Sequence, residues 1–150
     1  MRMAHFKFLL DRGVSHLARC FPAKRVVTTE SLGLPPDTPD EEIVGIASHN
    51  RYLLIAANRR DFMRLVPAYV AKSTKKSDGC RRVCGLILLV PNEQHVQERV
   101  LRGLENRMQL DGKKINYSDV HERDLLVQVE ADGKVKVTRL PRCPHCPYDD

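Results

Sequence analysis

Four polar residues with the chemistry of metal ligands follow short apolar segments of this sequence. Asp11 comes directly after Phe-Lys-Phe-Leu-Leu, Asp40 begins an acidic run, and Asn58 and Asp61 follow Leu-Leu-Ile-Ala-Ala. Carboxylates that crowd together repel one another, and a hard divalent cation is the usual reason why a protein tolerates them. Held by Asp11, Asp40 and Asp61, Mg²⁺ or Mn²⁺ could polarise a phosphodiester, orient a water as nucleophile and offset the charge of the leaving oxygen. Asn58 could position a ligand or a water.

The elements that must position these residues alternate in type along the chain. Short apolar segments predict strands, and apolar residues at helical spacing predict helices between them. Strands are expected at His5–Leu10, Arg25–Thr28, Tyr52–Ala57 and Gly85–Val90, and helices at 14–20, from Pro39 onward and from Val96 to Met108. The expected order, β-α-β-α-β-β-α, predicts an α/β fold with a mainly parallel central sheet.

Ligands of a parallel sheet bind beyond the carboxyl ends of its strands, where the following helices begin. We therefore expect Asp11, Asp40, Asn58 and Asp61 to share one edge of the sheet. Each residue also has an ordinary structural interpretation. Asp11 ends a strand, Asp40 complements a helix dipole, and the segment from Asn58 to Asp61 forms a turn.

Local signals mark where several elements begin and end. Thr38, Pro39 and Glu41 have the pattern of an N-cap, a first helical position and a capping box for the second helix. The remaining segments are expected to be a basic loop at 71–82 and a β-hairpin of Leu125–Glu130 and Lys134–Leu140 with a glycine turn.

The composition sets the class of protein. At 150 residues with 42% hydrophobic residues, the chain suits one domain with a real core. Charged residues make up 29%, no apolar run approaches the roughly 20 residues that cross a bilayer, and the N-terminus is too short and charged for a signal peptide. We expect a cytoplasmic protein without a membrane partner. The odd count of five cysteines favours reduced thiols or a metal over disulfides.

The basic residues indicate a polyanionic partner. The net charge is +6, and basic residues cluster at Arg59-Arg60, between Lys72 and Lys76, and at Arg81-Arg82. A solubilising surface is the alternative interpretation of such charge. Because aromatic residues are only 5% and tryptophan is absent, we expect base stacking to contribute little to any RNA recognition. The candidate RNA-contacting residues are Arg59, Arg60, Lys75, Lys76, Arg81 and Arg82.

Three segments together resemble the PIN-domain superfamily, in its short PIN-like branch. They are Phe-Leu-Leu-Asp11, the run Asp40-Glu-Glu-Ile43 with Ala47 after it, and Leu-Leu-Ile-Ala-Ala-Asn58-Arg-Arg-Asp61-Phe62, whose Asn-x-x-Asp-Phe element resembles that of VapC-type toxins. The resemblance covers residues 1–141 and leaves 142–150 as a tail with a C-x2-C. It implies a three-layer α/β/α fold and Mg²⁺- or Mn²⁺-dependent cleavage of RNA, often by the toxin of a toxin–antitoxin pair.

The resemblance also implies roles for residues and partners. Asp11, Asp40 and Asp61 carry over as metal-binding acids and Asn58 as a supporting residue. A further acid of longer PIN relatives falls in a shortened stretch here, which leaves Glu30, Glu41 or Glu42 as substitutes. Arg59 and Arg60 would grip a phosphate or neutralise the acids in place of a metal. The expected partners are RNA, a cognate antitoxin protein and a second copy in a homodimer.

Other functions compete with this one. A non-catalytic PIN-like module would bind RNA or a protein through its basic surface. Cys143 and Cys146 resemble half of a zinc site, which Cys80 and Cys84 could complete, although loose surface thiols are the simpler interpretation. No spacing supports a Cys-His nucleophile, and neither G-x-x-x-x-G-K-[ST] nor G-x-G-x-x-G occurs.

Overall fold

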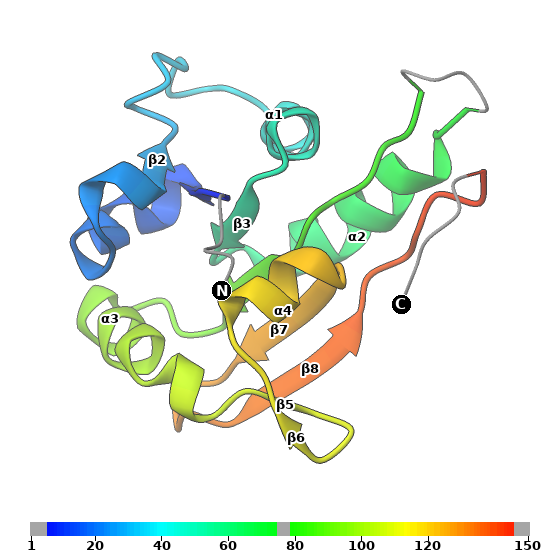
Figure 1. Ribbon diagram of the computed structural model, residues 1–150. Coiled ribbons are helices and arrows are strands. Elements are labelled where there is room, and N and C mark those ends of the chain that lie inside the picture. Colours follow the sequence, from blue (N-terminus) through cyan, green and yellow to red (C-terminus); the bar gives the residue numbers. More distant parts are fainter. Residues whose placement is uncertain (1–5, 75–78, 146–150) are drawn as a thin grey trace.

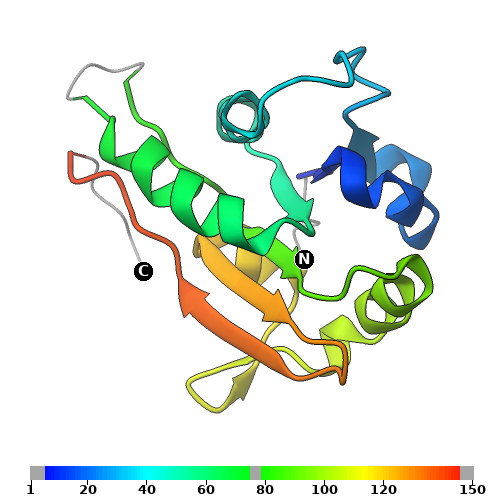
Figure 2. The same ribbon diagram turned by 180° about the vertical axis from the view of Figure 1, so that it is seen from behind.

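The central sheet has both faces covered by helices (Figures 1 and 2). The computed structural model describes residues 6–74 and 79–145. Within them, the sheet has the strand order β2-β1-β3-β4-β7-β8, and every neighbouring pair is parallel except β7 and β8. Its strands are β1 (Phe8–Leu10), β2 (Val26–Thr28), β3 (Leu53–Ala56), β4 (Leu86–Leu89), β7 (Leu125–Val129) and β8 (Val135–Arg139). The predicted α/β class with a mainly parallel sheet is confirmed.

Two groups of helices cover the two faces. One face carries the 3₁₀ helix η1 (Arg12–Cys20), α3 (Gln94–Arg102) and α4 (Tyr117–Glu122), and the other carries α1 (Asp40–Asn50) and α2 (Arg59–Ala71). The smaller elements are the 3₁₀ turns η2 (Ala23–Arg25) and η3 (Leu104–Asn106) and the hairpin of β5 (Gln109–Leu110) and β6 (Lys113–Lys114). None of the helices in the described part of the chain is both long and apolar enough to span a bilayer.

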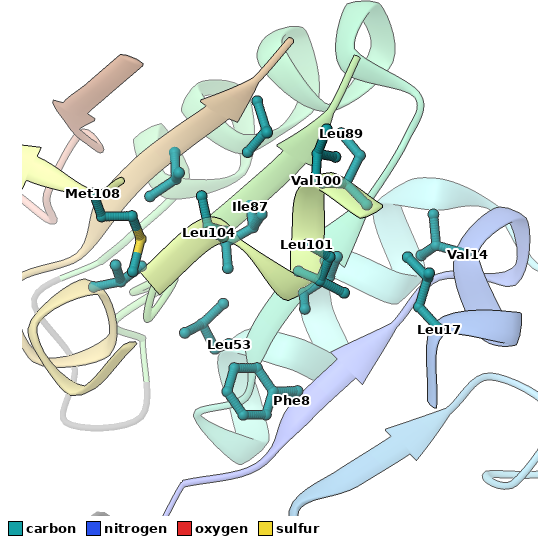
Figure 3. Packing of buried hydrophobic residues seen from close by; sticks show 14 of the residues in the cluster. Phe8, Val14, Leu17, Leu53, Ile87, Leu89, Val100, Leu101, Leu104 and Met108 are labelled. Atoms are coloured by element: carbon teal, nitrogen blue, oxygen red, sulfur yellow. The ribbon is translucent and has the colours of Figure 1, made fainter. Parts of the chain in front are cut away.

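Side-chain alternation along the strands divides the core between the faces. Phe8 and Leu10 of β1 pack with η1, α3 and α4, whereas Leu9 packs with α1 and α2. Figure 3 shows the first of these layers, in which Val14 of η1 and Val100 of α3 meet the sheet. Because both faces are buried, the strands are apolar throughout, as is typical of parallel sheets.

Gly85 fixes how closely α4 approaches the sheet. Its φ of +99° is strained for any residue with a side chain, and an added Cβ would lie 3.0 Å from the carbonyl oxygen of Val120 and 3.2 Å from Cγ of Leu53. The glycine therefore lets β4 begin directly beneath α4.

Several predicted boundaries are wrong. Thr38 does not cap α1, because its hydroxyl donates to the carbonyl oxygen of Pro35 at 2.7 Å, and Pro39 occupies the N-cap without a side-chain hydrogen bond. The first helix is a 3₁₀ helix that starts at Arg12 rather than 14. The predicted helix to Met108 ends at Arg102.

The expected turn from Asn58 to Asp61 is also wrong, because α2 begins at Arg59 and places Asp61 in its first turn. Helix α2 buries Phe62, Val66 and Val70 at four-residue spacing despite the proline at position 67. It adds a helix between β3 and β4 that the expected order lacked. The hairpin of β7 and β8 is confirmed, whereas α4 and the β5–β6 hairpin were not predicted.

Candidate active site

The predicted acids lie where the strand order reverses. From β1 the chain passes first to its neighbour β2 and then back to β3 on the other side, so the connections that follow β1 and β3 diverge. Such a switch point forms the ligand-binding crevice of open α/β sheets. Asp11 follows β1 and its backbone N–H donates to the carbonyl oxygen of Ile55 in β3 at 3.0 Å, while Asn58 follows β3. The structure thus places Asp11 and Asn58 at the carboxyl edge at which the sequence predicts them.

Asp11 is the most buried of the acids. Its backbone is extended, so its side chain continues the alternation of β1 and faces the same side as Leu9, toward α1 and α2. The residue is only 8% exposed. Burial raises the pKa of Asp11 above its ordinary value, the backbone N–H of Arg12 opposes this, and the charge of Asp40 raises the pKa further.

Asp40 is the middle member of a row of three acids. It is the first residue of α1 and is half-buried. Burial raises its pKa first, and the charge of Asp61 raises it further. Asp11 therefore interacts with Asp40, and Asp40 with Asp61, although 50 residues separate the two ends of the row.

Asn58 orients the third acid. Its side-chain amide donates to Oδ2 of Asp61 at 2.5 Å, and Nη2 of Arg64 lies 3.8 Å from Oδ1 of the same carboxylate. Arg60, Asp61 and Arg64 line a surface hollow of about 300 Å³. Asn58 thus orients the carboxylate of Asp61, which lines this hollow together with the two arginines.

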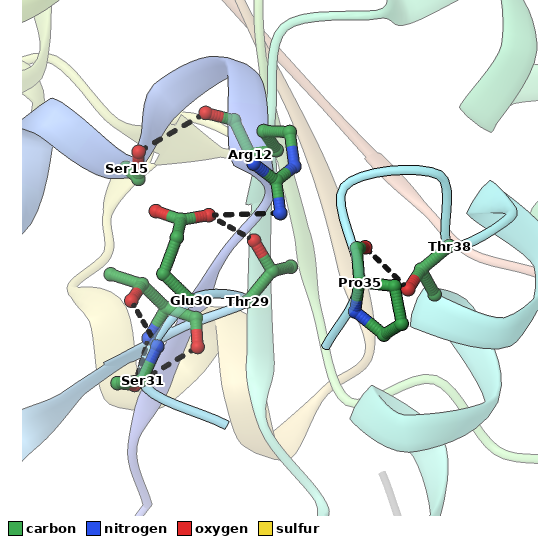
Figure 4. A network of polar contacts seen from close by, with 8 residues as sticks. Arg12, Ser15, Thr29, Glu30, Ser31, Pro35 and Thr38 are labelled. Carbon is green, nitrogen blue, oxygen red and sulfur yellow. Dashed lines mark hydrogen bonds and ion pairs between the residues drawn. The ribbon is translucent and has the colours of Figure 1, made fainter. Parts of the chain in front are cut away.

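Glu30 is a fourth acid, whose charge acts on Asp11, and Figure 4 shows its contacts with Thr29 and Arg12. The hydroxyl of Thr29 donates to Oε1 of Glu30 at 2.5 Å, and Nη2 of Arg12 lies 3.9 Å from the same oxygen. The hydrogen bond from Thr29 lowers the pKa of Glu30, and the charge of Glu30 in turn raises that of Asp11. Of the predicted substitutes, Glu41 instead bonds to Lys72 at 3.1 Å.

The sequence did not indicate Glu130, Arg12 or Arg64 as parts of the site. Glu130 is the first residue after β7, and its carboxylate lies 3.7 Å from Nη1 of Arg59. It follows a strand as Asp11 does, so the same rule would have found it. No sequence pattern marks Arg12 or Arg64, because only the fold brings each of them close to an acid.

The candidate RNA-contacting residues are divided between the two edges of the sheet. Arg59 and Arg60 lie beside the acids. Arg81 and Arg82 precede β4 and therefore lie at the opposite, amino edge, where Arg81 stacks on Tyr69 and Arg82 bonds to Asp124. Lys75 and Lys76 fall outside the described residues.

The cysteines do not behave as loose surface thiols. Cys84 and Cys143 are 1% and 2% exposed, so this expectation is wrong for both, whereas Cys20 and Cys80 are half-buried. Burial raises the pKa of Cys84 to about 11. Cys146 lies outside the described residues, so the proposed zinc pair is only half described.

Within residues 6–74 and 79–145, no group of three or more His, Cys, Asp or Glu side chains is arranged so that it could hold a metal ion as it stands. Comparison with protein-family models, curated proteins and solved structures finds no match to this chain.

Proposed function

We propose that this chain is a PIN-like, metal-dependent ribonuclease whose Asp11, Asp40 and Asp61 hold Mg²⁺ or Mn²⁺. The observation that supports it most strongly is the row of three carboxylates at the switch point of the sheet, in which the charge of Asp40 raises the pKa of Asp11 and the charge of Asp61 raises that of Asp40. Carboxylates brought together in this way repel one another, and a cation bound between them offsets that repulsion.

The donor set suits a hard divalent cation. It consists of carboxylate oxygens from three elements, with no sulfur or imidazole in the row. The three side chains would have to turn toward one ion, since they do not form a ready group in the described structure. When bound, Mg²⁺ or Mn²⁺ would act as a Lewis acid that polarises the phosphodiester and makes a water at the scissile bond more acidic.

The chain's own residues orient and neutralise the site. Asn58 holds the carboxylate of Asp61 in one orientation, and Thr29 does the same for Glu30. Arg60 and Arg64 border the hollow at Asp61, where a guanidinium pair suits the oxygens of a phosphate. Arg59 is directed to Glu130, so we assign phosphate contact to Arg60 and Arg64 before Arg59.

A non-catalytic module that binds RNA or protein is the second candidate. The observation that favours it is the pairing of two acids with nearby arginines, Asp61 with Arg64 at 3.8 Å and Glu30 with Arg12 at 3.9 Å. In this reading the arginines replace a metal as the counter-charge, and the edge of the sheet binds without cleaving.

Cleavage of a mixed RNA pool distinguishes these two functions. Wild-type protein with Mn²⁺ should cleave, and EDTA or the Asp40→Asn variant should abolish cleavage. Asp37→Asn is the matched control, because Asp37 is an exposed aspartate three residues before Asp40 and outside the row. Cleavage that persists in Asp40→Asn would contradict the assignment of the site. Absence of cleavage by folded wild-type protein, with RNA still bound, would favour the second candidate.

A further inference from the structure

A pocket of about 450 Å³ lies at the amino end of β1, at the opposite end of that strand from Asp11. It opens between the end of η1, the end of α3 and the start of α4. Three of the chain's four phenylalanines line it, together with one tyrosine: Phe6, Phe8, Phe21 and Tyr117. The volume falls within the range of small-molecule sites in proteins.

The aromatic rings form one packed wall. Phe8 stacks on Phe21 with ring centroids 4.3 Å apart and meets Tyr117 edge-on at 5.1 Å. Phe6 and Phe8 are buried, whereas Phe21 and Tyr117 are only partly buried and keep surface toward the pocket. Burial raises the pKa of Tyr117, and the charges of Glu105 and Cys20 act in the same direction, so its hydroxyl remains protonated and able to donate.

Polar groups surround the aromatic wall. The guanidinium of Arg25 lies over the ring of Phe6, 5.0 Å from its centroid, and Arg102 lines the other side. Glu105 supplies a carboxylate acceptor. Asn116, which also lines the pocket, caps α4 with its Oδ1, which accepts a hydrogen bond from the backbone N–H of Asp119. The side-chain amide N–H groups of Asn116 take no part in this cap. Nε of Arg25 donates to the carbonyl oxygen of Phe6 at 3.0 Å, and Nε of Arg102 donates to Glu98 at 3.2 Å, so a negatively charged ligand would be met by the terminal guanidinium nitrogens of these two lining arginines.

We propose that this pocket binds a nucleobase that carries a phosphate. Flat bases stack on aromatic side chains whatever their sequence, a carboxylate and an amide complement the donors and acceptors of a base edge, and arginine suits the phosphate. The base can come from a free mononucleotide or from an RNA strand. Binding here requires no metal and does not depend on the acids at the other edge.

This inference revises the expectation that base stacking would contribute little. That expectation rested on an aromatic content of 5%, which treats the aromatic residues as if they were spread evenly. The fold instead collects four of them, from positions 6 to 117, around one pocket. A low average therefore conceals a high local concentration.

A single tryptophan provides the test, because the natural chain contains none. In EDTA, the fluorescence of a Phe21→Trp protein should be quenched saturably by GMP, AMP, CMP or UMP, and much less by ribose 5-phosphate. The matched control is Met63→Trp, at an exposed position of α2 on the other face of the sheet, whose fluorescence should not respond. Equal quenching of both reporters, or no quenching of either, would overturn the proposal.

Two surface variants in the Phe21→Trp protein test the polar contacts without disturbing the core. Glu105→Gln and Arg102→Gln should each weaken mononucleotide binding by roughly tenfold, and the loss with Arg102→Gln should disappear when the corresponding nucleoside is used. Unchanged affinity in both variants would overturn the assignment of the pocket.

The source of the base is identified by competition. A short RNA oligomer that displaces the mononucleotide from the Phe21→Trp protein would identify an RNA strand as the source, and failure to displace it would identify the free nucleotide. Because nucleotide binding is measured without divalent metal, binding in EDTA combined with no RNA cleavage in Mn²⁺ would contradict the proposed ribonuclease and leave this inference standing. Cleavage without nucleotide binding would do the reverse.

Discussion

Replacing Arg82 by alanine should destabilise the fold and leave the acidic edge unaffected. Nε of Arg82 lies 2.9 Å from both carboxylate oxygens of Asp124, and its Nη2 donates to the carbonyl oxygen of Glu122. Asp124 is 1% exposed and sits where α4 passes into β7. In Arg82→Ala, this buried carboxylate loses its principal partner.

The size of the effect follows from the geometry. Removing one partner of a buried ion pair costs about 3–5 kcal/mol, because the remaining charge stays buried. Nε of Arg142 remains 3.9 Å from Oδ2 of Asp124, so we expect the lower end, about 3 kcal/mol. For a chain of this length, that loss lowers the Tm by roughly 6–12 °C.

The pH dependence of the loss has a definite sign. Burial raises the pKa of Asp124 above 3.8, and the hydrogen bond and charge of Arg82 oppose the rise. Without Arg82 the pKa of Asp124 in the folded protein rises further. The loss of stability is therefore present above that pKa, where the buried carboxylate is charged, and absent at low pH, where the carboxyl is protonated in both the folded and the unfolded protein. The difference in free energy of unfolding between wild type and Arg82→Ala should therefore shrink as the pH falls toward about 4.

Thermal unfolding followed by circular dichroism, with RNA binding measured in parallel, provides the assay. Arg82→Lys is the informative companion, because lysine keeps the charge but cannot reproduce the forked contact. A structural role predicts that both variants lose stability and that Arg82→Lys binds RNA normally. If Arg82→Ala unfolds within about 2 °C of wild type, the buried-pair reasoning is refuted.

Two further perturbations test the site and the packing. Asp11→Asn should raise the Tm at pH 7 in EDTA, because burial and then the charge of Asp40 raise the pKa of Asp11, so that its ionised form destabilises the wild-type fold. Wild type loses stability as the pH rises through this raised pKa, so the gain from the substitution should vanish below about pH 4. A gain that is independent of pH would contradict the electrostatic origin. Gly85→Ala should cost about 3 kcal/mol in urea unfolding, because its φ is +99° and the new Cβ meets Val120 at 3.0 Å, whereas Gly13→Ala, with no atom within 4 Å of its Cβ, should be close to neutral.

The parallel sheet and the position of the acids could be predicted because both depend on local patterns. The apolar strands end abruptly, and Asp11 is the first residue after β1 and Asn58 the second after β3. The helix that brings Asp61 into the site was missed, since its proline at position 67 and its arginine-rich first turn resemble a loop. Its buried stripe at Phe62, Val66 and Val70 was the stronger signal.

Contacts between distant segments could not be predicted. Thr38 has the residue type of an N-cap, but its hydroxyl donates to the carbonyl oxygen of Pro35, and Pro39 occupies the N-cap of α1. Arg82 looks like a phosphate ligand in the sequence, and only the fold places buried Asp124 opposite it. The aromatic pocket likewise joins residues from η1, β1 and α4, and no spacing in the sequence connects them.

Binding of Mn²⁺ by the metal-free protein tests the central claim most directly. Titration followed by electron paramagnetic resonance should show one site in wild type, and Asp11→Asn, Asp40→Asn and Asp61→Asn should each weaken it by roughly tenfold or more, because each removes a charged ligand. Asp37→Asn should bind like wild type. Equal Mn²⁺ affinity in all five proteins would contradict a metal site formed by these three aspartates.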